Sequence, residues 1–258
     1  MKLIQINAWM GKLSPTLLRF LRKENPDFIC VQEIFNSEKD VPVPNRQFNL
    51  GPEIRDLFNA DKTPPYYTYF SPRLSIEVAG DEKFFGNMIF SRLPFESTEN
   101  FITFGQPTFL ASHESSNANF AIGLQVAKIK VGDKSMILAN HHGYWVGGEN
   151  GKMGDDKSVE SMEKVAAKMR KFASEPIILA GDLNVVAESP AMRPFDNFLT
   201  DLTATHNIKN TLSGLKYDKP VPCDHILVND KILVKSFKVH NVIVSDHFPL
   251  AMEFDLIP

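Results

Sequence analysis

The sequence predicts an α/β protein in which mixed β-sheets pack on each other and helices lie outside them. Short apolar runs of roughly four to eight residues, a length typical of buried strands, recur along the whole chain. Several of these runs come in pairs, and segments with helical apolar spacing are interspersed in both halves. Paired strands with helices in each half favour packed sheets that are covered by helices.

The first half of the chain is expected to begin with a strand over Lys2 to Trp9. Ser14-Pro15 then offers an N-cap and a first-turn proline for a helix that Asn25-Pro26 ends. Residues 36–52 are polar and contain several prolines, which indicates a surface loop. Further elements are expected as strands over Asp27 to Gln32, Tyr66 to Phe70, Phe84 to Ser91 and Phe101 to Phe104, and as a short helix over Glu53 to Ala60.

The second half contains the clearest hairpin and the strongest helix. Ala118 to Val131 and Lys134 to Asn140 are predicted to be strands that turn at Gly132-Asp133. Lys157 to Phe172 carries apolar residues at helical spacing, so this stripe is expected to be core. The remaining elements are expected as strands over Pro176 to Ala180, Asp224 to Val228, Ile232 to Val239 and Phe248 to Phe254, and as a helix over Pro190 to Leu199.

The 258 residues are expected to form one domain, residues 1–258, because no Gly/Ser- or Pro-rich linker divides them. A composition of 43% hydrophobic and 23% charged residues is that of an ordinary soluble protein. Cys30 and Cys223 form no CxxC pair and are expected to pack, which fits a reducing compartment. The first residues have too short an apolar region for a signal peptide, and no run approaches membrane-spanning length. A cytoplasmic location is therefore expected, and a monomer is assumed because the sequence indicates no oligomeric state.

The charge balance argues against a protein that grips long nucleic acid non-specifically. There are 28 basic and 31 acidic residues, a net charge of −3. The densest basic clusters, Arg19 to Lys23 and Lys164 to Lys171, lie on helical patterns and indicate solvated faces, whereas a protein that neutralises many phosphates usually carries a basic stripe. A nuclease stays compatible with this balance, because a bound cation supplies positive charge locally.

Acid, amide and imidazole side chains stand where apolar runs stop. Ligands of open α/β sheets gather at strand ends, so several such ends that meet at one rim would build a metal-assisted hydrolytic site. The residues concerned are Asn7, Glu33, His142, Asp182, Asn184, Asp246 and His247, with Asp224 at the start of a further run.

Two of these groups have a distinct chemical interpretation. The amide of Asn7 and the carboxylate of Glu33 are the hard oxygen ligands that Mg²⁺ or Mn²⁺ prefers, although a glutamate at a strand end can also be a structural cap. Asp182 and Asn184 are two residues apart, so an extended backbone would point both side chains the same way. Asp182 can then position or deprotonate a water and Asn184 can donate to a phosphoryl oxygen; the alternative is an Asx-turn.

The segment SDHFPL is the sharpest signal, because an Asp-His pair between strand residues is an unusual choice for core packing. His247 is a candidate phosphate contact, and Asp224 a candidate to hold its imidazole in one tautomer. His142 is a second imidazole at a strand end. Adjacent His141 would face the opposite side of a continuing strand and is expected to be structural.

With these motifs in place, the chain resembles the endonuclease/exonuclease/phosphatase superfamily. This group includes pancreatic deoxyribonuclease, apurinic endonucleases, neutral sphingomyelinases and inositol polyphosphate 5-phosphatases. The matching segments, in the family's order, are INAW, VQE, GNMIFSRLP, NHH, GDLN, CDHILV and SDHFPL. The combination of GDLN and SDH is specific for this superfamily, whereas the other segments are individually weak signals. The resemblance implies a four-layer α/β sandwich, two packed mixed β-sheets flanked by helices, and divalent-metal phosphoester hydrolysis.

The resemblance also implies residue roles. Asn7 and Glu33 would hold Mg²⁺ or Mn²⁺, with Asp246 as a candidate further ligand. Asp182 would orient the attacking water and Asn184 would steady the phosphoryl group. The roles implied for the other matching positions are a phosphate contact or base at His247 oriented by Asp224, a phosphate contact or proton donor at His142, and a position near the site at Asn87. The family usually has a small residue before that histidine, so the doubled His141-His142 leaves open which one acts.

The substrate is less defined. Tyr144 and Trp145 follow His142, where their rings would stack on a base, line an apolar pocket or simply anchor the loop. The leading hypothesis is a Mg²⁺-dependent phosphodiesterase, a nuclease that cleaves DNA or RNA. The enzyme alternative is a phosphatase or phosphodiesterase acting on a small-molecule or lipid phosphate, such as an inositol phosphate or sphingomyelin. A non-catalytic binding scaffold is disfavoured, because every catalytic-type position is filled.

Overall fold

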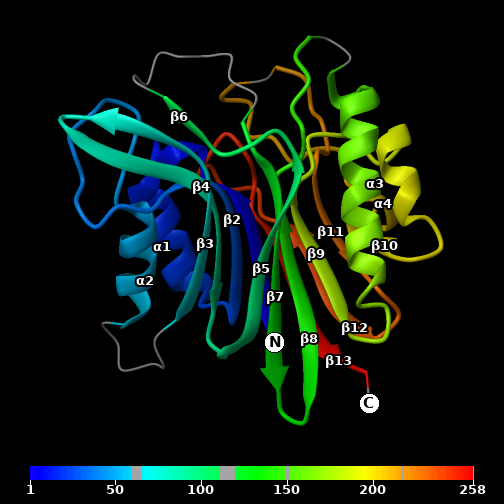
Figure 1. Cartoon of the computed structure of the whole chain (residues 1–258). Helices are drawn as coiled ribbons and strands as arrows, with labels where there is room; N and C mark the ends of the chain where they lie inside the picture. The colour runs from blue at the N-terminus through cyan, green and yellow to red at the C-terminus, as the bar shows by residue number, and fades with distance from the viewer. Residues whose placement is uncertain (60–65, 111–119, 149–150, 217, 258) are drawn as a thin grey trace.

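The computed structural model describes residues 1–59, 66–110, 120–148, 151–216 and 218–257. Two β-sheets face each other, with α1 and α2 on the outer side of one sheet and α3 and α4 on the outer side of the other (Figure 1). The predicted four-layer α/β sandwich is confirmed. Among the described residues, no helix is both long and apolar enough to cross a membrane.

The first sheet is mixed. β1 pairs parallel with β2 but antiparallel with β13. Within the described residues the sheet has seven strands. In spatial order the strands are β12 (Ile232–Val239), β13 (Leu250–Leu256), β1 (Lys2–Asn7), β2 (Phe28–Phe35), β4 (Asp81–Ser91), β3 (Tyr67–Val78) and β6 (Thr108–Leu110).

The second sheet has six strands within the described residues and is also mixed, with β8 and β9 parallel and the other pairs antiparallel. In spatial order the strands are β10 (Thr200–Asp201), β11 (Asp224–Val228), β9 (Ile177–Asp182), β8 (Lys134–His141), β7 (Ile122–Val131) and β5 (Phe95–Phe104).

The helical segments are α1 (Ser14–Glu24), α2 (Leu50–Asn59), α3 (Asp156–Arg170) and α4 (Leu202–Thr205), with 3₁₀ turns η1 (Trp9–Gly11), η2 (Gly151–Met153) and η3 (Pro190–Phe195). Asp155 caps α3, accepting from the backbone N–H of Ser158 at 3.0 Å. The expected cap at Ser14 is wrong: Ser14 is the first helical residue, and the cap position, Leu13, makes no side-chain cap hydrogen bond.

Several element boundaries differ from the expectation. The first strand ends at Asn7, because η1 begins at Trp9. The segment expected as a helix over Pro190 to Leu199 is the 3₁₀ turn η3, which contains a second proline, Pro194. The last strand begins at Leu250 rather than Phe248. The strand expected from Ala118 begins at Ile122, and residues 118–119 lie outside the described part of the chain.

Strict alternation divides the core into layers. In β8, Met136 and Leu138 face the first sheet, whereas Ile137 and Ala139 pack with the apolar stripe of α3. The expected role of that stripe as core is confirmed, since Met162, Val165 and Met169 are buried there. The same alternation continues past the strand end and decides which of two adjacent histidines faces the space between the sheets.

Candidate active site

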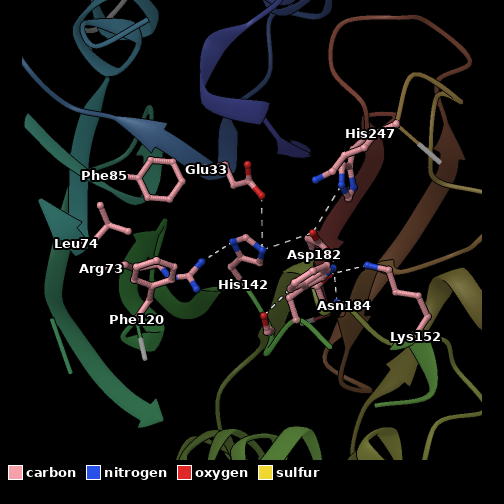
Figure 2. Close-up of a pocket in the computed structure, with 13 residues that line it drawn as sticks. Glu33, Arg73, Leu74, Phe85, Phe120, His142, Lys152, Asp182, Asn184 and His247 are labelled. Carbon is pink, nitrogen blue, oxygen red and sulfur yellow. Dashed lines mark hydrogen bonds and ion pairs between the residues drawn. The ribbon is translucent and has the colours of Figure 1, made fainter. Parts of the chain in front are cut away.

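A cavity of about 290 Å³ lies where the ends of β8 and β9 meet the facing sheet. Five of the polar residues singled out in the sequence line it: Glu33, His142, Asp182, Asn184 and His247. Figure 2 shows Asp182 between His142 and His247, with Glu33 directed at His142. These residues come from four separate segments of the chain.

A close approach of two strands brings Asp182 beside His142. β8 and β9 pair in parallel, with Asn140 opposite Ala180. A Cβ atom at Gly181 would lie 1.7 Å from the carbonyl oxygen of His141, so only glycine allows this approach. Asp182, which follows Gly181 and is the last residue of β9, therefore lines the pocket directly after this close approach.

The GDLN segment forms an Asx-turn, the alternative that the sequence left open. The backbone N–H of Asn184 donates to Oδ1 of Asp182 at 3.0 Å, and Asn184 has a φ of 60°, so the expected extended backbone is wrong. Both side chains nevertheless line the pocket. Nδ2 of Asn184 donates to the carbonyl of Gly143 at 3.1 Å, and Nζ of Lys152 donates to its Oδ1 at 2.6 Å. The amide is thus held at both ends.

Asp224 contacts His247 as expected. Nδ1 of His247 lies 2.8 Å from Oδ2 of Asp224, and Nε2 of the same ring lies 3.7 Å from Oδ2 of Asp182. Burial disfavours the charged ring, but the two carboxylates outweigh it and raise the pKa of His247 to about 10. His247 is therefore held as an imidazolium at neutral pH.

Asp182 is the buried anion at the centre of the site. Nδ2 of Asn7 donates to its Oδ2 at 3.1 Å, and Nε2 of His142 lies 3.6 Å away. Burial favours the neutral acid, but the charges of His247 and Lys152 hold the pKa of Asp182 well below its usual range. Asp182 is thus ionised at neutral pH and can accept hydrogen bonds, whereas its low pKa makes it a weak proton acceptor.

A chain of buried amides lies beneath the pocket and joins the two sheets. Nε2 of Gln5 donates to Oδ1 of Asp224 at 3.0 Å and to Gln32 at 2.9 Å. Gln32 donates to Asn140 at 2.7 Å, and Asn140 donates to Gln125 at 2.8 Å. Oε1 of Gln5 has no hydrogen-bond partner among the described residues, but Nε2 of Gln5 ties the carboxylate of Asp224 to the other amides and so holds it in place.

Asn7 and Glu33, two of the predicted metal ligands, are hydrogen-bonded to each other. Nδ2 of Asn7 donates to Oε1 of Glu33 at 3.1 Å, while Oδ1 of Asn7 accepts the backbone N–H of Trp9 at 3.0 Å. Glu33 lies at an irregularity in the pairing of β2 with β4, with a φ of 52°, and lines the cavity. Burial, joined by the charge of Glu33, raises the pKa of Asp246, and a divalent cation would relieve both effects.

A second group of potential metal-ligand atoms includes those of the Asp224–His247 pair. Ligand atoms of Asp182, Cys223, Asp224 and His247 lie within 4.8 Å of one another. Burial raises the pKa of the Cys223 thiol well above its usual value, and sulfur is a softer ligand than Mg²⁺ prefers. Carboxylate oxygens on the Glu33 side are the better fit to a hard cation such as Mg²⁺.

A family model described as the Endonuclease/Exonuclease/phosphatase family matches residues 4–247, which include every site residue described above. The chain belongs to this family. The expected resemblance is therefore confirmed. No curated protein matches the chain.

Solved structures share the fold of this family member at low sequence identity. An endonuclease/exonuclease/phosphatase from Beutenbergia cavernae DSM 12333 is 17% identical, with 100% of this chain and 72% of that chain covered and a TM-score of 0.73. The mannosyl-6-phosphatase of Bacteroides thetaiotaomicron VPI-5482 is 18% identical, with 99% of this chain and 100% of that chain covered and a TM-score of 0.71. D. rerio TDP2 complexed with single strand DNA product is 12% identical, with 99% of this chain and 98% of that chain covered and a TM-score of 0.66.

The remaining candidates lie in different surroundings. His141 faces away from the pocket, with its Nδ1 3.1 Å from the carbonyl of Gly123, so His142 is the histidine of the pair that lines the cavity. Asn87 is buried and is not among the lining residues. Tyr144 packs edge-on against Phe104 at 4.9 Å between ring centroids, which is the anchoring alternative. Trp145 lines the cavity with 58% of its surface exposed.

Sequence reasoning missed charged residues of the pocket, among them Arg73 and Lys216. Arg73 lies in the middle of β3, is buried, and donates from Nη1 to Nδ1 of His142 at 2.5 Å. A lone arginine within a strand carries no motif, so only the packing of the two sheets identifies it. Figure 2 shows an apolar wall of Leu74, Phe85 and Phe120 on the Arg73 side and Lys152 on the other side of the pocket.

Proposed function

We propose that the chain is a divalent-metal-dependent phosphodiesterase that cleaves DNA or RNA. The observation that carries the proposal is the position of Asp182, whose Oδ2 lies 3.6 Å from Nε2 of His142 and 3.7 Å from Nε2 of His247. A buried anion between two imidazoles, beside the metal-type carboxylate of Glu33, can orient a water for attack on phosphorus.

Each residue has a distinct part in the proposed reaction. Mg²⁺ or Mn²⁺ would be held by Asn7 and Glu33, with Asp246 as a candidate further ligand, and when bound would neutralise charge on a phosphoryl oxygen. Asp182 accepts a hydrogen bond from the attacking water, and Asn184 donates to the phosphoryl group. His247 contacts the phosphate as a charged donor, because its raised pKa makes it a poor base at neutral pH.

The test of the substrate class is a panel of phosphoesters, each assayed with Mg²⁺ or Mn²⁺. It contains single-stranded DNA, duplex DNA, RNA, abasic DNA, inositol phosphates and sphingomyelin. Cleavage of a nucleic acid supports the proposal. Release of phosphate from a small monoester, with every nucleic acid left intact, would transfer the assignment to the phosphatase alternative.

The second candidate is a phosphatase or phosphodiesterase for a small or lipid phosphate. It is favoured by the net charge of −3 and by the apolar wall of Leu74, Phe85 and Phe120. Proteins of similar fold include both a mannosyl-6-phosphatase and one complexed with single strand DNA product, so the fold alone does not choose. A non-catalytic scaffold is disfavoured, since each catalytic-type position is filled.

Excess chelator is expected to abolish hydrolysis, and Mg²⁺ or Mn²⁺ to restore it. Glu33→Gln should shift half-maximal activity to higher metal concentration, because a charged ligand is lost. In the wild type, metal should also raise Tm, since a ligand that binds only the folded state stabilises it, and this rise should shrink in Glu33→Gln.

The matched control for the metal prediction is Glu38→Gln, because Glu38 pairs with Arg55 at an exposed position. Its metal dependence should equal that of the wild type. Undiminished turnover after rigorous metal removal would end the mechanism proposed here. An equal Tm rise in wild type and Glu33→Gln would instead remove Glu33 from the ligand set.

Trp145→Ala is expected to raise KM more than it lowers kcat. Trp145 stands between the catalytic cavity and a neighbouring one of about 350 Å³, and Lys152 and Lys216 also line both. An exposed indole beside lysines suits a base next to a phosphate, and stacking of a base on an aromatic ring is worth about 1–3 kcal/mol. Steady-state kinetics on an oligonucleotide measures the effect.

Tyr144→Phe is the control, because it keeps the ring against Phe104 and should leave KM unchanged. Binding should also weaken only slightly with salt, because the net charge is −3 and the sequence shows no obvious basic stripe. For a protein that tracks duplex DNA, the logarithm of the binding constant falls with the logarithm of the salt concentration with a slope of about −0.9 per neutralised phosphate. A steep slope on long duplex DNA, or an unchanged KM in Trp145→Ala, would contradict loop-based binding.

A further inference from the structure

We propose that Arg73 is a positioning residue that fixes His142 as a neutral imidazole with its proton on Nε2. The role of that N–H toward substrate rests on the proposed function, whereas the proton position itself does not. The pair lies at one side of the pocket, with the guanidinium directed at the imidazole (Figure 2).

The proton position follows from the donors available. A guanidinium has five N–H donors and no acceptor, so Nδ1 of His142 must accept the hydrogen bond from Nη1 of Arg73, 2.5 Å away. An accepting Nδ1 carries no hydrogen. The single hydrogen of the neutral ring is therefore on Nε2.

Arg73 is itself held rigidly enough to impose this choice. Its Nε donates to the carbonyl of Ala121 at 2.8 Å, and only 7% of the residue is exposed. Burial lowers its pKa to about 10, so the guanidinium remains charged, and remains a donor, at neutral pH. The fork is therefore anchored by one nitrogen while another meets the imidazole.

The fixed N–H points toward the reactive side of the pocket. Nε2 of His142 lies 3.6 Å from Oδ2 of Asp182 and 4.0 Å from Oε1 of Glu33. An N–H between these carboxylates is placed to donate to an oxygen bound there. His142 then contacts substrate as an uncharged donor, which selects the phosphate contact over the proton donor left open by the sequence.

Two other buried histidines provide internal references. Nδ1 of His141 faces the carbonyl of Gly123, so this ring carries its hydrogen on Nδ1, the opposite tautomer. In His225 both nitrogens face acceptors, Asp201 and the carbonyl of Val185, so this ring carries two hydrogens. One protein thus contains all three protonation patterns against which His142 is compared.

The proton position is measured directly by long-range ¹H–¹⁵N correlation spectra of the whole protein with ¹⁵N-labelled histidine, without substrate and at neutral pH. Signals of His142 are those that vanish in His142→Gln. We expect a protonated Nε2 and a bare Nδ1. A protonated Nδ1, alone or together with Nε2, would overturn the proposal.

Variants test whether Arg73 is the cause. In Arg73→Met the donor is gone, so His142 should lose its single tautomer and kcat/KM on the cleaved phosphoester should fall by about ten- to hundredfold. Arg73→Lys keeps a donor and should recover the tautomer and most of the rate. Arg92→Met is the control, because Arg92 contacts Pro26 and the ring of Tyr66 instead.

The outcomes separate the two proposals. An unchanged His142 spectrum in folded Arg73→Met would show that Arg73 does not set the tautomer. A protein that cleaves no phosphoester, yet shows the expected spectra, would refute the proposed function and leave the tautomer assignment standing. Should Arg73→Met fail to fold, the wild-type and Arg73→Lys spectra still decide, because both must show the Nε2–H form.

Discussion

Asp182→Asn is expected to lower kcat by roughly 10²–10⁴-fold while the protein stays folded, the usual size of a lost acid–base contribution. Asparagine keeps the side-chain shape, and its oxygen can still accept the backbone N–H of Asn184 that closes the turn. What disappears is the negative charge that faces His142 and His247. The water that Asp182 orients would then lose its anionic acceptor. Single-turnover rates measure the effect, and circular dichroism with thermal melting checks the fold.

The matched control for Asp182→Asn is Asp155→Asn. Asp155 also accepts a backbone N–H, that of Ser158, but it caps α3 and does not line the pocket. Its kcat should equal that of the wild type. If folded Asp182→Asn kept a near wild-type kcat, the assignment of Asp182 as the water-orienting group would be wrong.

Much of the site was predictable from polar residues at strand ends, because the alternation of side chains along a strand can be deduced from its apolar positions. Asp182 is on the inner face of β9, as are Ile178 and Ala180, so its direction follows from their apolar character. The same parity separates His142 from His141. The fold class followed from strand and helix patterns for the same reason, since each apolar face must be buried against another layer.

Contacts between the two sheets could not be predicted this way. Arg73 reaches His142 from a strand of the opposite sheet, and no local pattern encodes which residues meet across that gap. Asn87, like Asn7 and Asp246, is buried and is not among the residues that line the cavity, so its expected place near the site stays a prediction. The sequence does not distinguish the Asx-turn of Asp182 from an extended backbone, because both place the side chains of Asp182 and Asn184 toward the pocket.

Short elements at sheet edges were also missed. β6 and β10 have three and two residues, too few to show an alternating pattern. They exist because a neighbouring strand offers free hydrogen-bonding groups, a property of the assembled sheet. In η3, Pro194 lacks the N–H that would donate to the carbonyl of Pro190 in a regular α-helix, although the apolar spacing resembles one.

Asp224→Ala and His247→Ala are each expected to remove most turnover, and together to cost little more than either alone. The two side chains meet at 2.8 Å, and Asp224 also accepts from Gln5 at 3.0 Å, so the carboxylate is fixed before it orients the ring. Groups that act as one unit lose their function once, whichever member is removed. A double-mutant cycle on kcat/KM measures the coupling between them.

A second buried Asp-His pair in the same chain supplies the control for that cycle. Nδ1 of His225 lies 2.8 Å from Oδ2 of Asp201, the same separation as in the Asp224–His247 pair, but neither residue lines the pocket. Asp201→Ala and His225→Ala should therefore couple in the free energy of unfolding while kcat stays close to wild type. The Asp224–His247 pair should couple in both quantities, since a buried charge loses its partner and the substrate loses an oriented donor. Additive losses in kcat/KM for Asp224→Ala and His247→Ala would mean that Asp224 acts on the reaction independently of the imidazole. Coupling in unfolding alone would reduce the Asp224–His247 pair to a structural ion pair, and His247 would then need another reason to face Asp182.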